Sequence, residues 1–216
     1  VDFTSAEDDL ADVGFKAMAV NLSDIAAMGA VPESALVTLT LPKENATKIA
    51  GQVYEGIIEA AKRFDVAIAG GDLSTYEGPL AINIVILGHV RDGDPWLRSG
   101  ALEGDIVLAS GSFGGSIVGR HLRPTPRIEL ASAIRNLATV HAEIDVSAGL
   151  SLDLDRLCAS SGLGVELDVE AIPIHPDAIK LAANTGRPPF QHAWSDGEDF
   201  ELLLAVPASD AESLLA

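Results

Sequence analysis

The chain carries at residues 12–41 the stretch DVGFKAMAVNLSDIAAMGAVPESALVTLTL, whose apolar residues change their spacing partway along. From Phe15 to Ile25 they recur every three or four positions, which predicts an amphipathic helix over residues 12–28. Over residues 37–41 apolar and polar side chains alternate, which predicts a half-buried strand. A helix followed closely by a strand indicates a protein of mixed α and β structure.

Helices and strands are expected to alternate along the rest of the chain. We predict further helices at residues 49–64, 130–137, 150–160 and 178–184, and further strands at residues 66–69, 80–90 (a central strand), 106–109, 144–146, 165–169 and 200–206. Because each element must bury one face against another layer, this order predicts an α+β fold made of two α/β subdomains.

A polar, proline-containing stretch from Arg120 to Arg127 predicts a linker between the subdomains. We therefore place an N-terminal domain, a β-sheet packed with helices, at residues 1–119 and a C-terminal α/β domain at residues 120–216. Residues 208–216 have the pattern of a helix that is cut short, so we expect the C-terminal domain to be truncated.

The chain is strongly acidic, with 32 acidic against 14 basic residues and a formal net charge of -18. This balance argues against a nucleic-acid partner, because phosphate backbones bind cationic patches. No stretch is long and apolar enough to span a membrane, and the first residues lack the basic and apolar regions of a signal peptide, so we expect a cytoplasmic protein. The single cysteine, Cys158, is expected to pack in the core.

Most carboxylates fit a solvated surface, but Asp24, Asp72 and Asp145 lie in apolar or glycine-rich surroundings. Asp24 is either an exposed helix side chain or a cation ligand among apolar neighbours. Asp72 ends the triplet 70–72, GGD, where the backbone either approaches a phosphate or makes an ordinary turn. Asp145 lies between a predicted strand and a predicted helix, close to the hydroxyl of Ser147.

Two further loops contain polar groups, and each loop has two possible interpretations. Residues 111–115, GSFGG, either hold a phosphate through backbone N–H groups or form a flexible turn, and they lack the Lys-Ser/Thr ending of a Walker A loop. Residues 197–201 place three carboxylates ahead of a strand, as ligands of a hard cation or as loop acidity. The histidines have no zinc-site spacing and no G-x-S-x-G motif is present, so no covalent catalytic residue is expected.

Residues 20–30, VNLSDIAAMGA, resemble a signature of the thiamine-monophosphate kinases, a family within the aminoimidazole-ribonucleotide synthetase superfamily. The resemblance continues in the family's order over nearly the whole chain. Its other motifs are Gly70-Gly71-Asp72, Arg98-Ser99-Gly100-Ala101 with Gly104-Asp105, Asp145-Val146-Ser147 before Gly149-Leu150, and Gly197-Glu198-Asp199-Phe200-Glu201-Leu202.

The resemblance implies an ATP-dependent kinase that needs Mg²⁺ and works as a homodimer. The N-terminal domain would pair with a second subunit through β-strands, with ATP bound near the dimer interface. The implied site residues are Asp24, Asp72 and Asp145 as magnesium ligands, Tyr54, Gly71, Asp72, Arg98 and Ser147 around the nucleotide, and Glu198 facing the thiamine moiety.

The sequence departs from the family pattern at two positions within it. Asp2 stands at a substrate-contacting position where the family usually has a histidine, and Ala148 stands where the family has a second aspartate. We expect the family's aspartate-rich glycine loop before residue 1 and its final substrate-stacking aromatic residue after residue 216.

The reaction that the resemblance implies is phosphorylation of thiamine monophosphate to thiamine diphosphate by ATP. The acceptor phosphate is already ionised near neutral pH, so no general base is expected. Two alternatives stay open. Another superfamily member would act on a different acceptor, such as a ribonucleotide amide, selenide or the thiocarboxamide of a maturation protein, and a non-catalytic homologue would only bind nucleotide or dimerise.

Overall fold

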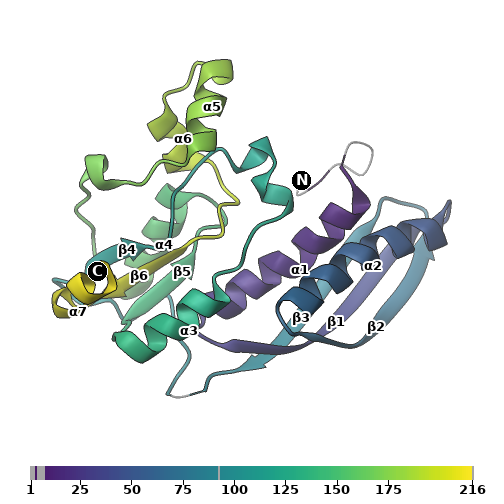
Figure 1. Cartoon of the computed structure of the whole chain (residues 1–216), viewed down its shortest axis with the longest axis horizontal. Helices are drawn as coiled ribbons and strands as arrows, with labels where there is room; N and C mark the ends of the chain where they lie inside the picture. Colours follow the sequence, from purple (N-terminus) through teal and green to yellow (C-terminus); the bar gives the residue numbers. More distant parts are fainter. Residues whose placement is uncertain (1–2, 4–7, 92, 216) are drawn as a thin grey trace.

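The computed structural model describes residue 3, residues 8–91 and residues 93–215, so Asp2 lies outside the described residues. Two three-stranded sheets lie side by side, and the long helices α1 and α2 lie against the first of them (Figure 1). In chain order the elements are α1 Leu10–Ala27, β1 Val31–Pro42, α2 Ala46–Arg63, β2 Ala67–Tyr76, β3 Ala81–His89, β4 Ile106–Ala109, η1 Ser116–Val118, η2 Arg120–Leu122, α3 Ile128–Leu137, β5 Ala142–Asp145, α4 Leu150–Ser161, η3 Val169–Ala171, α5 Pro176–Thr185, α6 Pro189–Ser195, β6 Leu202–Val206 and α7 Ala208–Leu215.

The predicted mixed α and β architecture is confirmed, but the central strand of the first sheet is β1 and not the strand that was predicted to be central. The order of this sheet is β2-β1-β3, with β1 parallel to β2 and antiparallel to β3. The apolar run 80–90 was predicted as a central strand, and this is wrong because β3 lies at the edge. One face of β3 packs inward through Ile84, while Val85 and Leu87 on the other face are 46% and 57% exposed. The run is apolar on both faces although only one face is buried.

Strand β2 is longer and more exposed than the short buried strand predicted at residues 66–69. It continues through the triplet Gly70-Gly71-Asp72, so of the two interpretations of this triplet the ordinary turn is wrong, and the approach to a phosphate stays a prediction. The backbone reason lies at Gly71, which pairs with Val37 of β1. A Cβ atom on Gly71 would lie 1.7 Å from the carbonyl oxygen of Val37, so only glycine allows this close approach of the two strands.

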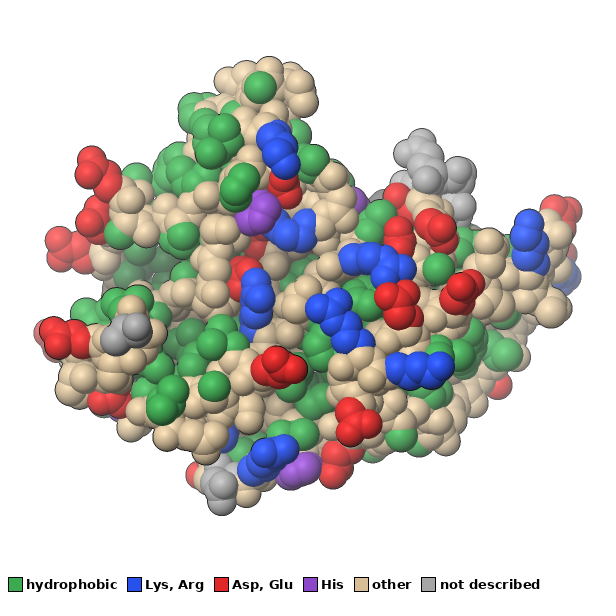
Figure 2. Space-filling view, viewed as in Figure 1, with side chains coloured by type: hydrophobic (Ala, Val, Ile, Leu, Met, Phe, Trp, Pro, Cys, Tyr) green, Lys and Arg blue, Asp and Glu red, His purple; other side chains and the backbone are tan. Residues whose placement is uncertain are grey.

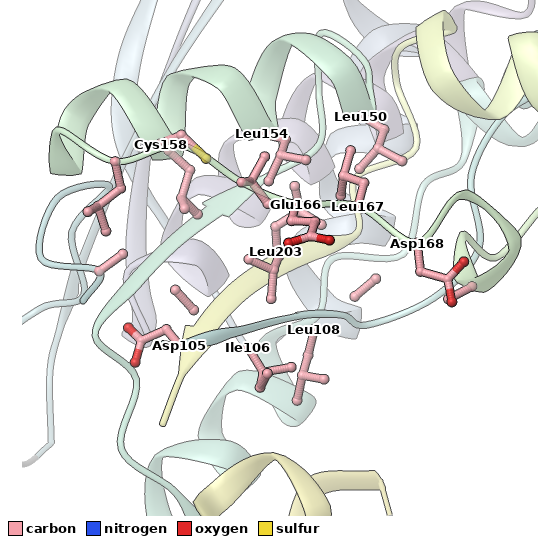
Figure 3. A pocket seen from close by; sticks show the side chains of 18 of the residues that line it. Asp105, Ile106, Leu108, Leu150, Leu154, Cys158, Glu166, Leu167, Asp168 and Leu203 are labelled. Carbon is pink, nitrogen blue, oxygen red and sulfur yellow. The ribbon is translucent and has the colours of Figure 1, made fainter. Parts of the chain in front are cut away.

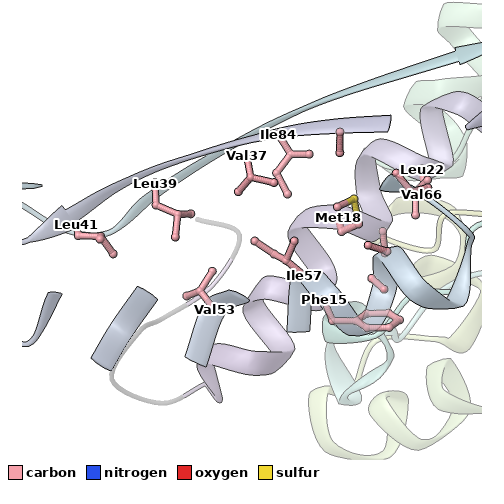
Figure 4. Close-up of a cluster of buried hydrophobic side chains, with 14 residues drawn as sticks. Phe15, Met18, Leu22, Val37, Leu39, Leu41, Val53, Ile57, Val66 and Ile84 are labelled. Atoms are coloured by element: carbon pink, nitrogen blue, oxygen red, sulfur yellow. The ribbon is translucent and has the colours of Figure 1, made fainter. Parts of the chain in front are cut away.

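Helices α1 and α2 cover one face of the first sheet and form its core with it. Figure 4 shows apolar side chains of both helices directed toward those of β1 and β3. The two helices approach each other through glycines. A Cβ atom on Gly14 would lie 1.9 Å from the Val53 carbonyl oxygen, and one on Gly56 would lie 1.7 Å from the Ala11 carbonyl oxygen. This close approach of backbones fixes how the helix pair sits on the sheet.

The second sheet has the order β4-β6-β5, with both pairs antiparallel. Its central strand β6 is buried on both faces: Leu203 and Ala205 pack with α4 and α6, while Leu202 and Leu204 pack with α3 and α7. Strand β4 precedes the boundary predicted at residue 120 and nevertheless belongs to this sheet. The boundary itself stays a prediction.

Two local predictions in the second half are wrong. Residues 165–169 form no strand and run as an exposed loop into η3. Helix α6 was not predicted, because its seven residues are too few to show a helical period. Cys158 is partly buried against the core of this half, as expected.

A charged contact fastens the segment after η2 to the first helix pair. Arg123 donates to Asp12 at 2.5 Å and to Glu59 at 2.6 Å, and its guanidinium lies 4.8 Å from the ring centre of Phe15. Figure 2 shows acidic and basic side chains close together on the face over α1 and α2. Among the described helices, none is long and apolar enough to cross a membrane.

We predict that Gly56→Ala lowers the free energy of unfolding by about 1–3 kcal/mol, because the added methyl group would overlap the Ala11 carbonyl oxygen at the helix crossing. Gly51→Ala on the same helix is the matched control, since nothing lies within 4 Å of the added methyl group. The free energy of unfolding of the control should rise by about 0.5–1 kcal/mol, because alanine has a higher helix propensity than glycine. Urea unfolding of both variants measures the difference, and equal effects would refute the close approach of α1 and α2.

Candidate functional site

The end of β5 meets α1 through a buried hydrogen bond. Ser23 Oγ donates to Asp145 Oδ2 at 2.7 Å, and Asp145 is only 4% exposed. Burial raises the pKa of Asp145 to about 6, and the nearby charges of Asp24 and Asp153 act in the same direction. The hydrogen bond from Ser23 and the charge of Arg98 oppose this rise without cancelling it.

Asp24 follows Ser23 on α1 and is exposed. Partial desolvation raises its pKa, and Arg98, in the loop between β3 and β4, lowers it in part. The fold therefore brings together three of the predicted site residues, Asp24, Arg98 and Asp145. The raised pKa values of the two carboxyls indicate that burial at this point is only partly compensated by the hydrogen bond and the positive charge that the protein supplies.

The two carboxylates fit a magnesium ion that is shared with a bound phosphate. Carboxylate oxygens are the hard ligands that Mg²⁺ prefers, and Mg²⁺ is commonly held by one or two carboxylates together with substrate phosphates and water. Within the described ranges no three histidine, cysteine or acidic side chains come together as a metal cluster. The arrangement thus suits an ion that arrives with a phosphate rather than one enclosed by protein ligands alone.

The other predicted nucleotide residues lie on separate elements. Asp72 lies on the exposed strand β2, opposite Thr38 of β1. Tyr54 on α2 is partly buried and packs against the core of the first sheet. Across the part of the chain that the structure describes, no hydrogen bond or ion pair joins Asp72 or Tyr54 to Asp145, and the roles of these two residues stay predictions.

The loop after β5 contains Ser147 and Ala148, and both are exposed. The backbone N–H of Ala148 donates to Asp153 Oδ2 at 2.7 Å, and Arg156 donates to the other oxygen of Asp153 at 2.7 Å. Asp153 is 1% exposed. Its carboxylate therefore holds the loop at the start of α4, and the side chain at position 148 supplies no carboxylate of its own.

The glycine-rich loop 111–115 is hydrogen-bonded to a carboxylate of the protein itself. Asp199 accepts the N–H of Gly114 at 3.0 and 2.9 Å with its two oxygens, and Arg120 donates to it at 2.7 Å. These contacts favour a structural turn over a phosphate cradle at this N–H. Glu201 is likewise paired with Arg127 and accepts Ser110 Oγ at 2.5 Å.

Glu198 differs from the other two acids of the loop 197–201. Its side chain remains 29% exposed, and Lys16 of α1 donates to its Oε1 at 2.6 Å. Lys16, which is itself 3% exposed, was missed by the sequence reasoning. The available signal was a charged residue between Phe15 and Ala17, inside the apolar part of the predicted helix.

Glu143 is a second group that the sequence reasoning missed. It lies two residues before Asp145 on the same face of β5, is 2% exposed, and neither carboxylate oxygen has a hydrogen-bond donor among the described residues. Burial, reinforced by the charge of Asp145, raises its pKa well above the ordinary value. Burial of this kind favours the neutral form of the carboxyl over the charged form.

A cavity with a volume of about 1000 Å³ lies elsewhere, between the second sheet and α4. Figure 3 shows Leu150, Leu154 and Cys158 of α4 facing Leu203 of β6 across it. Its lining is mostly aliphatic. It does not include Asp24 or Asp145, so this cavity is not the candidate site.

We predict that Asp145→Asn stabilises the magnesium-free protein above pH 6. The folded state holds the Asp145 proton more tightly than the unfolded chain, because the pKa rises from 3.8 to about 6. Stability contributed by this carboxyl therefore falls as pH rises between those values, by about 3 kcal/mol in all. The uncharged amide avoids this loss, so the variant should exceed wild type by up to about 3 kcal/mol above pH 6 and by little near pH 4.

Urea unfolding with a chelator at about pH 4 and about pH 7.5 measures this effect. Asp155→Asn, on an exposed part of α4, is the control and should change stability by less than about 0.5 kcal/mol at both pH values. An Asp145→Asn difference that does not vary with pH would show that charge burial at Asp145 is absent.

Comparison with known proteins agrees with these features. The family profile described as AIR synthase related protein, N-terminal domain, matches residues 1–90. A thiamine-monophosphate kinase from Rhodopirellula baltica is 62% identical over 211 residues, which cover 98% of this chain and 66% of that protein. A thiamine-monophosphate kinase from Bacillus subtilis is 33% identical over 225 residues, which cover 94% of this chain and 68% of that protein. The chain thus spans about two thirds of the length of these relatives.

Solved structures share the fold. The structure of AaThiL complexed with AMPPCP and TMP matches with a TM-score of 0.85 and 29% identity, and the match covers 94% of this chain and 71% of that one. The crystal structure of thiamine monophosphate kinase from Aquifex aeolicus matches with a TM-score of 0.86 and 30% identity, over 94% of this chain and 74% of that one. Motifs, fold and relatives agree, and the chain belongs to the thiamine-monophosphate kinase family.

Proposed function

We propose that this chain transfers the γ-phosphoryl group of ATP to the phosphate of thiamine monophosphate, which gives thiamine diphosphate and ADP. The observation that carries the proposal is the meeting of Asp24 and Asp145 beside Arg98, at the junction of α1 and β5. A relative with 62% identity is a thiamine-monophosphate kinase, and a solved structure with the same fold is complexed with AMPPCP and TMP.

The reaction forms a bond between an acceptor phosphate oxygen and the γ-phosphorus. It breaks the bond from that phosphorus to the β,γ-bridging oxygen, and the electron pair of the broken bond leaves with ADP. The acceptor oxygen is already ionised, so no protein side chain needs to remove a proton. The protein contributes by aligning the two phosphates and by stabilising negative charge in the transition state.

Each predicted site residue has a part in this proposal. Asp24, Asp72 and Asp145 would hold Mg²⁺, which neutralises part of the triphosphate charge when it is bound. Arg98 supplies a positive charge next to Asp24 and Asp145. Tyr54, Gly71 and Ser147 would contact the nucleotide, while Glu198 and the position of Asp2 would contact the acceptor. The use of ATP is consistent with a cytoplasmic enzyme.

We further propose that the protein is a homodimer that pairs through the first sheet. The face of this sheet away from α1 and α2 carries large apolar side chains, with Leu36 43%, Val85 46% and Leu87 57% exposed. An apolar surface of this kind on a sheet favours association over exposure to water. The exposed strand β2, which carries Asp72, would then lie at the interface.

A non-catalytic homologue is the second candidate, and Ala148 is the observation that favours it. Position 148 is exposed beside Asp145 and offers no metal ligand. Such a protein would bind nucleotide without turnover. A family member with a different acceptor would release ADP only when that other acceptor is present.

We predict magnesium-dependent formation of thiamine diphosphate from ATP and thiamine monophosphate, and a loss of at least about 100-fold in kcat for Asp24→Asn. The amide keeps the shape of the side chain but is a poor magnesium ligand. Product is measured by chromatography at several magnesium concentrations. Asp155→Asn is the control for loss of one surface charge and should keep wild-type kcat. ADP release that does not respond to thiamine monophosphate, or no release at all, would reject the proposal in favour of the alternatives.

For the dimer, we predict that Leu87→Lys converts the protein to a monomer, because a charge on the outer face of β3 would be buried between the two sheets. Leu137→Lys is the matched control, since Leu137 is 69% exposed on α3, away from the first sheet. Sedimentation velocity separates a monomer of 22.4 kDa from a dimer of twice that mass. A wild-type monomer, or an unchanged dimer in Leu87→Lys, would contradict this arrangement.

A further inference from the structure

We propose that Lys16 is a positioning residue for the acceptor substrate, acting through the Glu198 carboxylate that it holds. This inference rests on the proposed function, because it assigns a role within the same site. It concerns a residue on α1 that lies outside the family motifs and reaches the acceptor loop of the other half of the molecule through a hydrogen bond of 2.6 Å.

The burial of Lys16 shows that its contact with Glu198 is not an incidental surface pair. Lys16 is 3% exposed and lies next to Phe15, which is in the core of the first sheet. An ammonium group buried to this extent is unfavourable unless it is paired and hydrogen-bonded. The contact between the ammonium group of Lys16 and Glu198 is therefore needed to stabilise the lysine at this buried position.

The backbone around Glu198 is held in a conformation that few residues adopt. Glu198 has φ of 63° and Phe200 has φ of 53°, both in the left-handed region. The N–H of Glu198 donates to the Ser147 carbonyl at 2.8 Å, and the N–H of Phe200 donates to the Val146 carbonyl at 2.8 Å. Such strain persists only where the surroundings impose it, and it is concentrated at functional sites.

Glu198 is also the one acid of the loop 197–201 that remains accessible to a ligand. Asp199 and Glu201 are each 6% exposed and are paired with Arg120 and Arg127. The Glu198 side chain is 29% exposed while Lys16 contacts its Oε1. The ammonium group thus fixes one oxygen and leaves the carboxylate facing solvent beside Ser147, where the acceptor would meet the nucleotide.

Helix α1 sets the distance between the two sides of the reaction. Lys16 and Ser23 are seven residues apart, so they lie on the same face of the helix, about 10 Å apart along its axis. Ser23 holds Asp145 at the metal side, and Lys16 holds Glu198 at the acceptor side. Phosphoryl transfer depends on how the acceptor oxygen is placed relative to the γ-phosphorus, so a rigid spacer between these two contacts aids the reaction.

The test compares steady-state kinetics of Lys16→Met, Lys16→Arg, Glu198→Gln and the double variant Lys16→Met/Glu198→Gln with wild type. Lys16→Met should raise the KM for thiamine monophosphate by about tenfold and change the KM for ATP by less than about twofold, because the carboxylate on the acceptor side is released. Lys16→Arg keeps the positive charge, so its KM for thiamine monophosphate should lie between those of wild type and Lys16→Met. Lys180→Met removes an exposed lysine paired with Asp177 on α5 and should match wild type.

The double variant separates positioning from a general loss of structure. If Lys16 acts through Glu198, the double variant should be no worse than the worse single variant. Additive effects, equal changes in both KM values, or a wild-type KM for thiamine monophosphate in Lys16→Met would each overturn the inference. If Lys16→Met does not fold, Glu198→Gln and Lys16→Arg decide, and wild-type acceptor KM in both overturns it. Turnover of the wild-type protein is measured first, and its absence refutes the proposed function itself.

Discussion

Helix α1 packs against both halves of the molecule, and the candidate site lies where it meets the second. One side of the helix joins α2 and the first sheet through Phe15, Met18 and Leu22, with Gly14 at the crossing. Its C-terminal end packs with the second sheet, where Ala26 contributes to the core. A helix that is apolar around most of its circumference can be buried in this way. The polar residues that it does carry toward the second half are therefore constrained in position by packing on both sides.

Asp145 in the candidate site differs from Asp199 and Glu201 in that no arginine is bound to its carboxylate. Asp199 and Glu201 are each paired with an arginine, as buried acids usually are. Asp145 has a neutral hydroxyl as its hydrogen-bond donor, and Arg98 acts on it only as a nearby charge. Arginine pairing serves to join segments of the fold, whereas unpaired carboxylates at the end of a strand are suited to a cation that comes and goes with a nucleotide.

Periodicity predicted the longer helices and most strands because most of them have one face on a core. It predicted β3 as a strand but gave the wrong position in the sheet, because apolar residues also face outward there, and it predicted a strand at residues 165–169 where none forms. Asp24 and Asp145 were predictable as a pair from the motifs. Lys16 and Glu143 could not be predicted from the sequence. Lys16 is paired with a side chain 182 residues away, and Glu143 has no hydrogen-bond donor among the described residues, and sequence spacing reveals neither fact.

The alanine at position 148 affects the electrostatics of the loop after β5, because a carboxylate there would add to the negative charge of the nearby acids. Asp153 accepts the N–H of Ala148, and the charge of Asp153 in turn acts on Asp145, three residues before Ala148 at the end of β5. A further carboxylate at position 148 would add repulsion to a region where burial already raises the pKa of Asp145 to about 6. Alanine avoids that repulsion in the ion-free protein. If Asp24 and Asp145 hold Mg²⁺ as proposed, alanine at position 148 would favour stability without the cation over affinity for it, and the two aspartates would still match the one or two carboxylates with which Mg²⁺ is commonly held beside a phosphate.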